Sequence, residues 1–144
     1  MDTRRFVIGT IVGAVMLFIV GYIIFDWLFA SFYAANAGSA TGVDRTEILY
    51  WAVVLANLSY GALLVYAIGN RAGTLSVLSG AKVGAIVGFL LWLTVDFIFY
   101  GYTNLSTLTK TIVDPLLELV HAGIAGAVVA AVLKKVPASG PKPA

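Results

Sequence analysis

The sequence contains no cysteine, a single histidine and few charged residues. Without cysteine, disulfide bonds and thiolate chemistry are both excluded. Charged residues make up 11% of the chain, and the formal net charge is only +2. The pI near 9.0 is therefore no indication of nucleic-acid binding, because so small an excess of positive charge creates no basic surface. We predict that the protein has no nucleic-acid partner.

Long apolar stretches fill most of the chain, in which 60% of the residues are hydrophobic and the mean hydropathy is +0.97. Each stretch matches or exceeds the ~20 apolar residues that a helix needs to cross a bilayer. The connectors are too short to hold another domain. We therefore predict an all-α integral membrane protein, with one four-helix bundle over residues 1–136, surrounded by the lipid bilayer, and a disordered tail over 137–144. The predicted spans are residues 6–34, 48–68, 78–102 and 111–133.

The basic residues lie unevenly around these spans. Because cytoplasmic loops carry an excess of Lys and Arg, this distribution predicts that both termini are cytoplasmic. The alternative is a cleaved signal peptide, since Arg4 and Arg5 precede an apolar stretch that is followed by Ala35-Asn36-Ala37. The residues on the predicted cytoplasmic side are Arg4, Arg5, Arg71, Lys82, Lys134, Lys135 and Lys142, and those on the other side are Arg45 and Lys110.

Most acidic residues fall on the predicted outer side, although acids hardly affect the orientation of insertion. Asp44 and Glu47 suit an aqueous connector or the N-cap region of the second helix. Asp114 precedes Pro115, which is the pattern of an N-cap followed by proline at the first helical position. This pattern predicts that the last helix begins at Pro115, after an outer loop over residues 103–113. A functional role for Asp114 stays open.

Polar residues inside the spans form a candidate site. An ionisable side chain in a spanning helix is costly and usually faces the bundle interior or a water-filled cavity. Glu118 and His121 are three residues apart, so they share one helical face. We predict an outward-facing pocket that binds a proton, a cation or a small polar solute, in a binding or transport module. Its predicted residues are Asp26, Asn57, Asp96, Asn104, Glu118 and His121.

The spacing of Glu118 and His121 also raises a metal hypothesis, because carboxylate bundles hold iron or manganese with a Glu-x-x-His element. Such bundles carry two copies of the element and two further glutamates, whereas this chain has one copy. A single divalent cation held by these two residues with Asp26 and Asp96 stays open as the cofactor. So does the simpler interpretation that the polar groups only bond the helices to one another.

No catalytic site is recognisable in the sequence. The histidine has no Ser or Cys at a nucleophile elbow, and no glycine-rich phosphate loop follows a strand. Acid chemistry by Asp26, Asp96 or Glu118 stays open, but the sequence favours a protein that is not an enzyme. The main alternative to a binding module is an accessory or structural subunit that docks onto a larger membrane complex or onto further copies of itself.

Small residues recur at four-residue spacing in three of the spans. Such stripes let helix backbones approach closely. We predict that they pack the helices inside the bundle, with contacts in a homo-oligomer as the alternative. The stripe residues are Gly9 and Gly13 in the first span, Gly80, Gly84 and Gly88 in the third, and Ala122 and Gly126 in the fourth.

The first and third spans are similar to each other. Residues 12–15 (VGAV) and 26–29 (DWLF) parallel residues 83–86 (VGAI) and 96–99 (DFIF). This similarity predicts a parallel two-plus-two duplication, which would bring Asp26 and Asp96 to comparable depth. Aromatic residues near these aspartates, including Tyr33, are predicted to form an interfacial belt.

Three motifs resemble those of a group of small bacterial four-helix membrane proteins of unknown function. The motifs are Asp26-Trp27-Leu28, residues 100–108 (YGYTNLSTL) and residues 118–122 (ELVHA). The chain departs from the group at Gly101, where the group has Asp, and at His121-Ala122, where the group has Trp-Gly. The resemblance implies a four-helix fold and the inner (plasma) membrane of a bacterial cell, and it implies no activity.

Overall fold

The computed structural model describes residues 2–69 and 75–137, and over these residues the chain forms helices and one isolated antiparallel bridge. Four helical segments are long and apolar enough to cross a membrane, which confirms the predicted number and type of elements. Arg71, Lys142 and nearly all of the predicted tail lie outside the described residues. The four segments are Thr3–Leu28, Tyr50–Gly69, Val77–Tyr102 and Leu108–Lys135.

The first predicted span is divided into three elements. Helix α1 (Thr3–Gly21) begins at Asp2, whose carboxylate accepts a hydrogen bond from the Arg5 N–H at 3.0 Å. It continues as the π-helix η1 (Tyr22–Leu28), whose last turn is closed by a bond of 2.9 Å from the Phe29 N–H to the Ile24 carbonyl. A short helix, α2 (Ala30–Ala35), follows. The prediction of one continuous helix over 6–34 is therefore wrong, because the i to i+5 bonding of η1 widens the helix before it breaks.

Of the remaining helices, α4 (Val77–Tyr102) and α5 (Leu108–Lys135) begin at side-chain caps. Helix α3 spans Tyr50–Gly69. Helix α4 begins with a capping box in which the Ser76 and Ser79 side chains each accept the other's backbone N–H. Helix α5 is capped by Thr107, whose hydroxyl accepts the Lys110 N–H at 3.2 Å.

The predicted start of the last helix at Pro115 is wrong. Thr107 already caps α5, so Asp114 and Pro115 lie inside the helix, two turns after its beginning. Pro115 has no N–H to donate to the carbonyl four residues earlier, and the helix continues although this hydrogen bond is missing. The outer connection before α5 is correspondingly shorter than residues 103–113.

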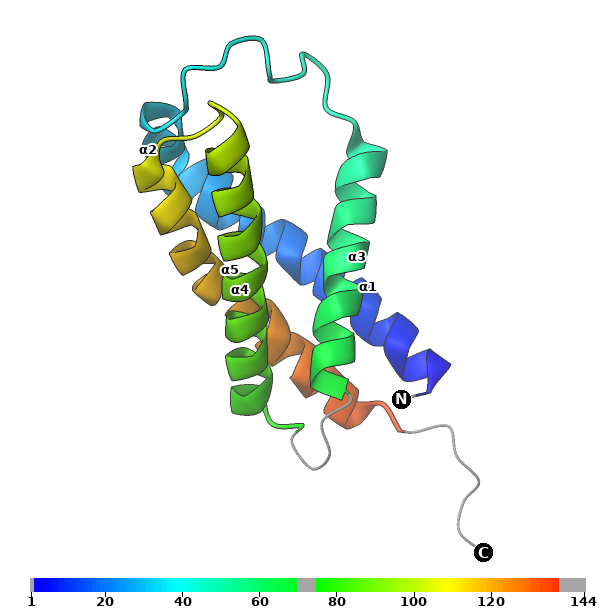
Figure 1. The fold of residues 1–144 in the computed structure, drawn as a ribbon. Helices are drawn as coiled ribbons and strands as arrows, with labels where there is room; N and C mark the ends of the chain where they lie inside the picture. The colour runs from blue at the N-terminus through cyan, green and yellow to red at the C-terminus, as the bar shows by residue number, and fades with distance from the viewer. Residues whose placement is uncertain (1, 70–74, 138–144) are drawn as a thin grey trace, which may run out of the picture.

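The helices alternate in direction, so that α1 begins where α5 ends (Figure 1). The Arg5 guanidinium joins these two ends, because it donates a hydrogen bond to the Leu133 carbonyl at 2.9 Å. Helix α5 packs most extensively on α4 and also on α1, which in turn packs on α3. We call the end that holds Arg5 and Leu133 the inner end of the bundle, and the opposite end, with α2 and the long connection before α3, the outer end.

The small-residue stripes lie at helix interfaces within the bundle. At Gly80 and Gly84 a Cβ atom would collide with the α5 backbone at Gly126 and Ala122 respectively. On the other side, a Cβ atom on Gly13 would lie 3.2 Å from the Cα atom of Gly61 on α3. These glycines let the backbones approach closely in the inner half of the bundle. The buried apolar core lies between the same helices and includes Leu17, Leu64, Val65, Val129 and Leu133.

At the outer end, residues 36–40 and 104–107 are bound to each other, and we call this pair of segments the outer strap. The Gly38 N–H donates to the Leu105 carbonyl at 3.1 Å, and the Thr107 N–H donates to the Asn36 carbonyl at 3.2 Å. A Cβ atom on Gly38 would collide with the Asn104 carbonyl, so this close approach requires glycine. The outer strap holds α2 beside the beginning of α5.

Candidate functional site

A cavity of about 590 Å³ lies in the outer half of the bundle, between α1, η1, α2, α3, α4 and α5. Its volume is within the range of small-molecule sites. The lining reaches inward to Leu17, Leu63 and His121. Beyond these residues the side chains of the core are closely packed, with Leu64 and Val65 fully buried. The cavity is therefore closed toward the inner end by the packed core.

One face of α5 supplies the charged wall of the cavity. Its polar residues follow one another at intervals of three or four, so they lie in a line along the helix. At ~1.5 Å per residue this line extends about 15 Å from the outer end toward the middle of the bundle. Polar groups buried so completely need hydrogen-bond partners. The residues of this line, with their exposed fractions, are Thr111 (1%), Asp114 (8%), Glu118 (2%) and His121 (6%), and the last three line the cavity.

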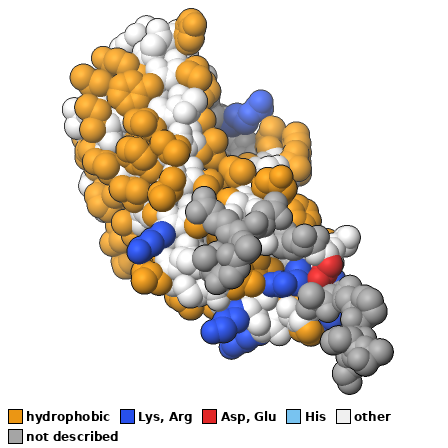
Figure 2. Space-filling view, turned by 60° about the horizontal axis from the view of Figure 1, so that its bottom comes forward, with side chains coloured by type: hydrophobic (Ala, Val, Ile, Leu, Met, Phe, Trp, Pro, Cys, Tyr) orange, Lys and Arg blue, Asp and Glu red, His pale blue; other side chains and the backbone are white. Residues whose placement is uncertain are grey.

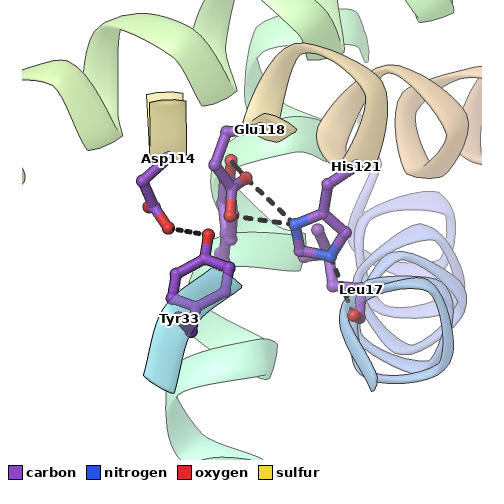
Figure 3. Close-up of polar contacts among 6 residues, drawn as sticks. Leu17, Tyr33, Asp114, Glu118 and His121 are labelled. Atoms are coloured by element: carbon purple, nitrogen blue, oxygen red, sulfur yellow. Dashed lines mark hydrogen bonds and ion pairs between the residues drawn. The ribbon is translucent and has the colours of Figure 1, made fainter. Parts of the chain in front are cut away.

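His121 is bonded through both ring nitrogens (Figure 3). Its Nε2 atom lies 2.8 Å from the Leu17 carbonyl, which can only accept, so Nε2 carries a hydrogen. Its Nδ1 atom lies 3.0 and 2.9 Å from the two carboxylate oxygens of Glu118. One proton is shared between Nδ1 and the carboxylate, and the pair has zero net charge whichever group holds it.

Aromatic residues surround this pair. The Tyr60 hydroxyl donates to Oε2 of Glu118 at 3.2 Å, and the Phe25 ring meets the His121 ring edge to face, with centroids 5.3 Å apart. The imidazole lies against Gly21, where a Cβ atom would be 3.3 Å from Nε2. Tyr60, Phe25 and Gly21 are not among the pocket residues predicted from the sequence. Tyr60 follows Asn57 by three residues and so shares its helical face, which is the signal that could have identified it.

A second polar pair lies nearer the outer end. The Tyr33 hydroxyl, carried by α2, donates to Oδ1 of Asp114 on α5 (Figure 3). Burial and this carboxylate both raise the pKa of Tyr33 well above its usual range, so the phenol stays a neutral donor. The Lys110 ammonium lies 5.2 Å from the centroid of the Tyr33 ring. Asp114 is therefore a buried acceptor rather than the predicted helix cap.

The six predicted pocket residues occupy different places. Asp26, Asn57, Glu118 and His121 line the cavity, with Asp26 exposed at its rim. The Asn57 amide also donates to the Val53 carbonyl at 2.9 Å, one turn earlier on α3. Among the described residues, the lining does not include Asp96 or Asn104.

Asp96 and Asn104 lie outside the cavity wall. Asp96 interacts electrostatically with Asp114 and Lys110, and its Oδ2 atom is buried without a hydrogen-bond partner in the described part of the chain. Asn104 is exposed in the outer strap, where its carbonyl accepts the Ala40 N–H at 3.1 Å. Asp96 therefore belongs to the group of charged residues around Asp114, outside the lining, whereas Asn104 bonds the two segments of the outer strap to each other.

The metal hypothesis for Glu118 and His121 lacks suitable geometry. Within residues 2–69 and 75–137, no three His, Asp or Glu side chains are placed to hold one ion. Each nitrogen of His121 is already directed at a protein partner, so a metal would have to displace Glu118 or Leu17. The arrangement is suited to proton sharing and to polar contacts with a bound molecule.

No protein-family model matches the chain, and neither a curated protein nor a solved structure matches it. The fold and the site therefore define only a class: a helical protein with four helices long and apolar enough to cross a membrane, and a cavity with a charged wall between them.

Proposed function

We propose that this chain is a multi-pass membrane protein that binds a small molecule in the outer half of its bundle. Large hydrophobic side chains exposed on the outer sides of the helices support the membrane assignment, because lipid is the solvent that suits them. They include Ile11, Phe18, Leu55, Tyr66, Leu90 and Ile98.

The charge distribution supports cytoplasmic termini. Figure 2, which brings the inner end forward, shows Lys and Arg side chains around that end beside a largely hydrophobic surface. Arg4, Lys82, Lys134 and Lys135 belong to the inner ends of α1, α4 and α5. Because cytoplasmic loops carry an excess of Lys and Arg, this distribution favours a cytoplasmic inner end. The resemblance to small bacterial membrane proteins favours the inner (plasma) membrane.

The observation that carries the binding proposal is the cavity beside the Glu118–His121 pair. A polar pair that only joined helices would need no open space next to it, because protein interiors are packed as closely as organic crystals. Here the pair forms the wall of a space of about 590 Å³. Its closed inner end favours binding over passage through the bundle.

A cavity-filling variant tests the proposal. Ala56 lines the cavity at its exposed edge, whereas its neighbour Leu55 is also exposed but is not part of the lining, and it serves as the matched control. We expect that some members of a diverse library of small molecules raise the melting temperature of the wild type and of Leu55→Trp, and fail to raise that of Ala56→Trp. Ligands that stabilise both variants equally, or a library without any stabilising compound, would contradict the proposal.

Cysteine labelling tests the orientation, because the natural chain has no cysteine. Ser39 is exposed in the outer strap, and Lys135 is exposed at the inner end of α5. We expect an impermeant maleimide to label Ser39→Cys in intact cells and Lys135→Cys only after permeabilisation. The reverse pattern would show that the bundle has the opposite orientation.

A further inference from the structure

We infer that the ligand of this cavity is a hydrophobic organic cation, an amine or quaternary ammonium ion with an apolar body. The inference rests on the proposed binding function and specifies its ligand class. It is drawn from three properties of the cavity: its charge, its aromatic walls and the position of its opening.

The cavity has an excess of negative charge. Its lining contains Asp26, Asp114 and Glu118, and the described lining residues include no Lys or Arg. Because the Glu118–His121 pair is neutral as a unit, the two aspartates set the charge of the lining, which is negative when they are ionised. The Lys110 ammonium lies nearby, beside Tyr33, but is not part of the lining. A cation is attracted into such a site and an anion is repelled, more strongly than in water, since the surroundings are apolar.

Aromatic side chains form much of the remaining wall. Rings attract cations through their faces, and cages of such rings are the usual way in which proteins hold quaternary ammonium groups. The Trp92 indole N–H is buried and makes no well-formed hydrogen bond in the described part of the chain, although it interacts with the nearby Tyr60 hydroxyl. An oxygen of a ligand could take the place of that contact. The aromatic residues of the lining are Phe18, Tyr22, Phe25, Tyr33, Tyr60 and Trp92.

The cavity opens through the side of the bundle. Phe18, Tyr22 and Leu63 line it and are also exposed on the molecular surface. They belong to α1, η1 and α3, which approach closely at Gly13 and Gly61 in the inner half. The opening therefore lies between these helices in the outer half, where they would face lipid. A ligand that enters there must partition into the bilayer, so an apolar body is required in addition to the positive charge.

The test compares three small aromatic ligands that differ in charge. Benzyltrimethylammonium is the cation, neopentylbenzene is its uncharged isostere, and benzenesulfonate is the anion. Binding is followed in nanodiscs through the indole N–H resonance of Trp92, with the exposed Trp51 as the reference outside the cavity. We expect the cation to shift the Trp92 signal and to bind about tenfold or more tightly than the neutral isostere. A partly buried contact between a cation and aromatic rings or a carboxylate contributes binding free energy of that size. The anion should leave the signal unchanged.

Charge-removing variants make the test specific. Asp114→Asn keeps an oxygen that accepts from Tyr33, and it should weaken cation binding about tenfold. Asp26→Asn changes an exposed rim residue, so it cannot disturb packing, and it should weaken binding roughly threefold. Asp44→Asn, in the exposed connection outside the cavity, should have no effect.

Each failure points to a different conclusion. Equal binding of the cation and its neutral isostere, or preferred binding of the anion, would overturn the cation inference and leave the binding function standing. Unchanged cation affinity in both Asp114→Asn and Asp26→Asn would overturn it as well. If none of the three probes shifts Trp92, the cation inference is overturned, and the comparison of Ala56→Trp with Leu55→Trp then decides separately whether the cavity binds any molecule.

Discussion

The Nδ1 atom of His121 lies 2.9 Å from Oε2 of Glu118, one turn earlier on α5, while the opposite ring nitrogen reaches the Leu17 carbonyl of α1. The imidazole thus joins two helices at the floor of the cavity. Because both residues are almost fully buried, removal of one partner leaves the other without the group that satisfies it.

We expect His121→Ala to lower the free energy of unfolding by about 3–5 kcal/mol, since it leaves Glu118 buried with only the Tyr60 hydroxyl as a partner. The double variant Glu118→Leu/His121→Leu should lose much less than the sum of the two single Leu variants, because it leaves no uncompensated charge. Unfolding titrations in mixed micelles measure these differences. Additive effects of the two single variants would show that the residues are not coupled.

Tyr33→Phe should cost about 1–3 kcal/mol of stability, because it removes the donor to the buried Asp114 carboxylate. The pKa of Tyr33 is raised in the folded protein, so its contribution is present below the usual tyrosine pKa of about 10 and is lost as the pH rises above that value. The difference in unfolding free energy between wild type and Tyr33→Phe should be constant at neutral pH and shrink in strong base.

Tyr102→Phe is the control for this measurement, because Tyr102 is 88% exposed. Its stability should follow that of the wild type at every pH. A difference between wild type and Tyr33→Phe that grows in base would contradict the assigned hydrogen bond.

Gly84→Ala should destabilise the bundle by about 1–3 kcal/mol, because the added methyl group meets the Ala122 carbonyl of α5 and forces the two helices apart. Gly101→Ala, near the end of the same helix, is the matched control. A Cβ atom there meets nothing within 4 Å, and replacing a helical glycine by alanine is neutral or favourable by up to about 1 kcal/mol. Similar stabilities for both variants would exclude the close contact of α4 with α5.

The outer strap can be tested by cross-linking. Ala37 and Ser106 form an antiparallel bridge pair, so their Cβ atoms face each other at a distance that a disulfide can span with small adjustments. We expect the double variant Ala37→Cys/Ser106→Cys to form an intramolecular disulfide under mild oxidation, detected by mass spectrometry and by altered gel mobility without reductant. Each single variant is the control. A double variant that stays reduced would show that the two segments do not pair.

The polar site illustrates the limits of local patterns. Glu118 and His121 could be placed on one face from their spacing, because neighbours along a helix are fixed by its geometry. The partner Tyr60 is 58 positions from Glu118, and Tyr33 is 81 positions from Asp114. No periodicity connects residues on different helices, so these contacts could not be predicted from the sequence.

Asp114 shows how tertiary structure overrides a local signal. The Asp-Pro pair favours a helix start, but Thr107 caps α5 two turns earlier, where its backbone and side chain both bond to Asn36 in the outer strap. Once the strap fixes the beginning of α5, Asp114 lies within the helix and is buried against α2. Its role as an acceptor for Tyr33 follows from that long-range contact.

The sequence by itself determined the four long apolar helices and the stripes of small residues, because helix hydrogen bonds are local and hydropathy is read residue by residue. Only the tertiary structure decided which glycines meet across the interfaces, where η1 interrupts the first span, and which polar residues surround a common cavity. The physical reason is that packing and buried hydrogen bonds join residues far apart in the chain, and their geometry exists only once the helices have come together.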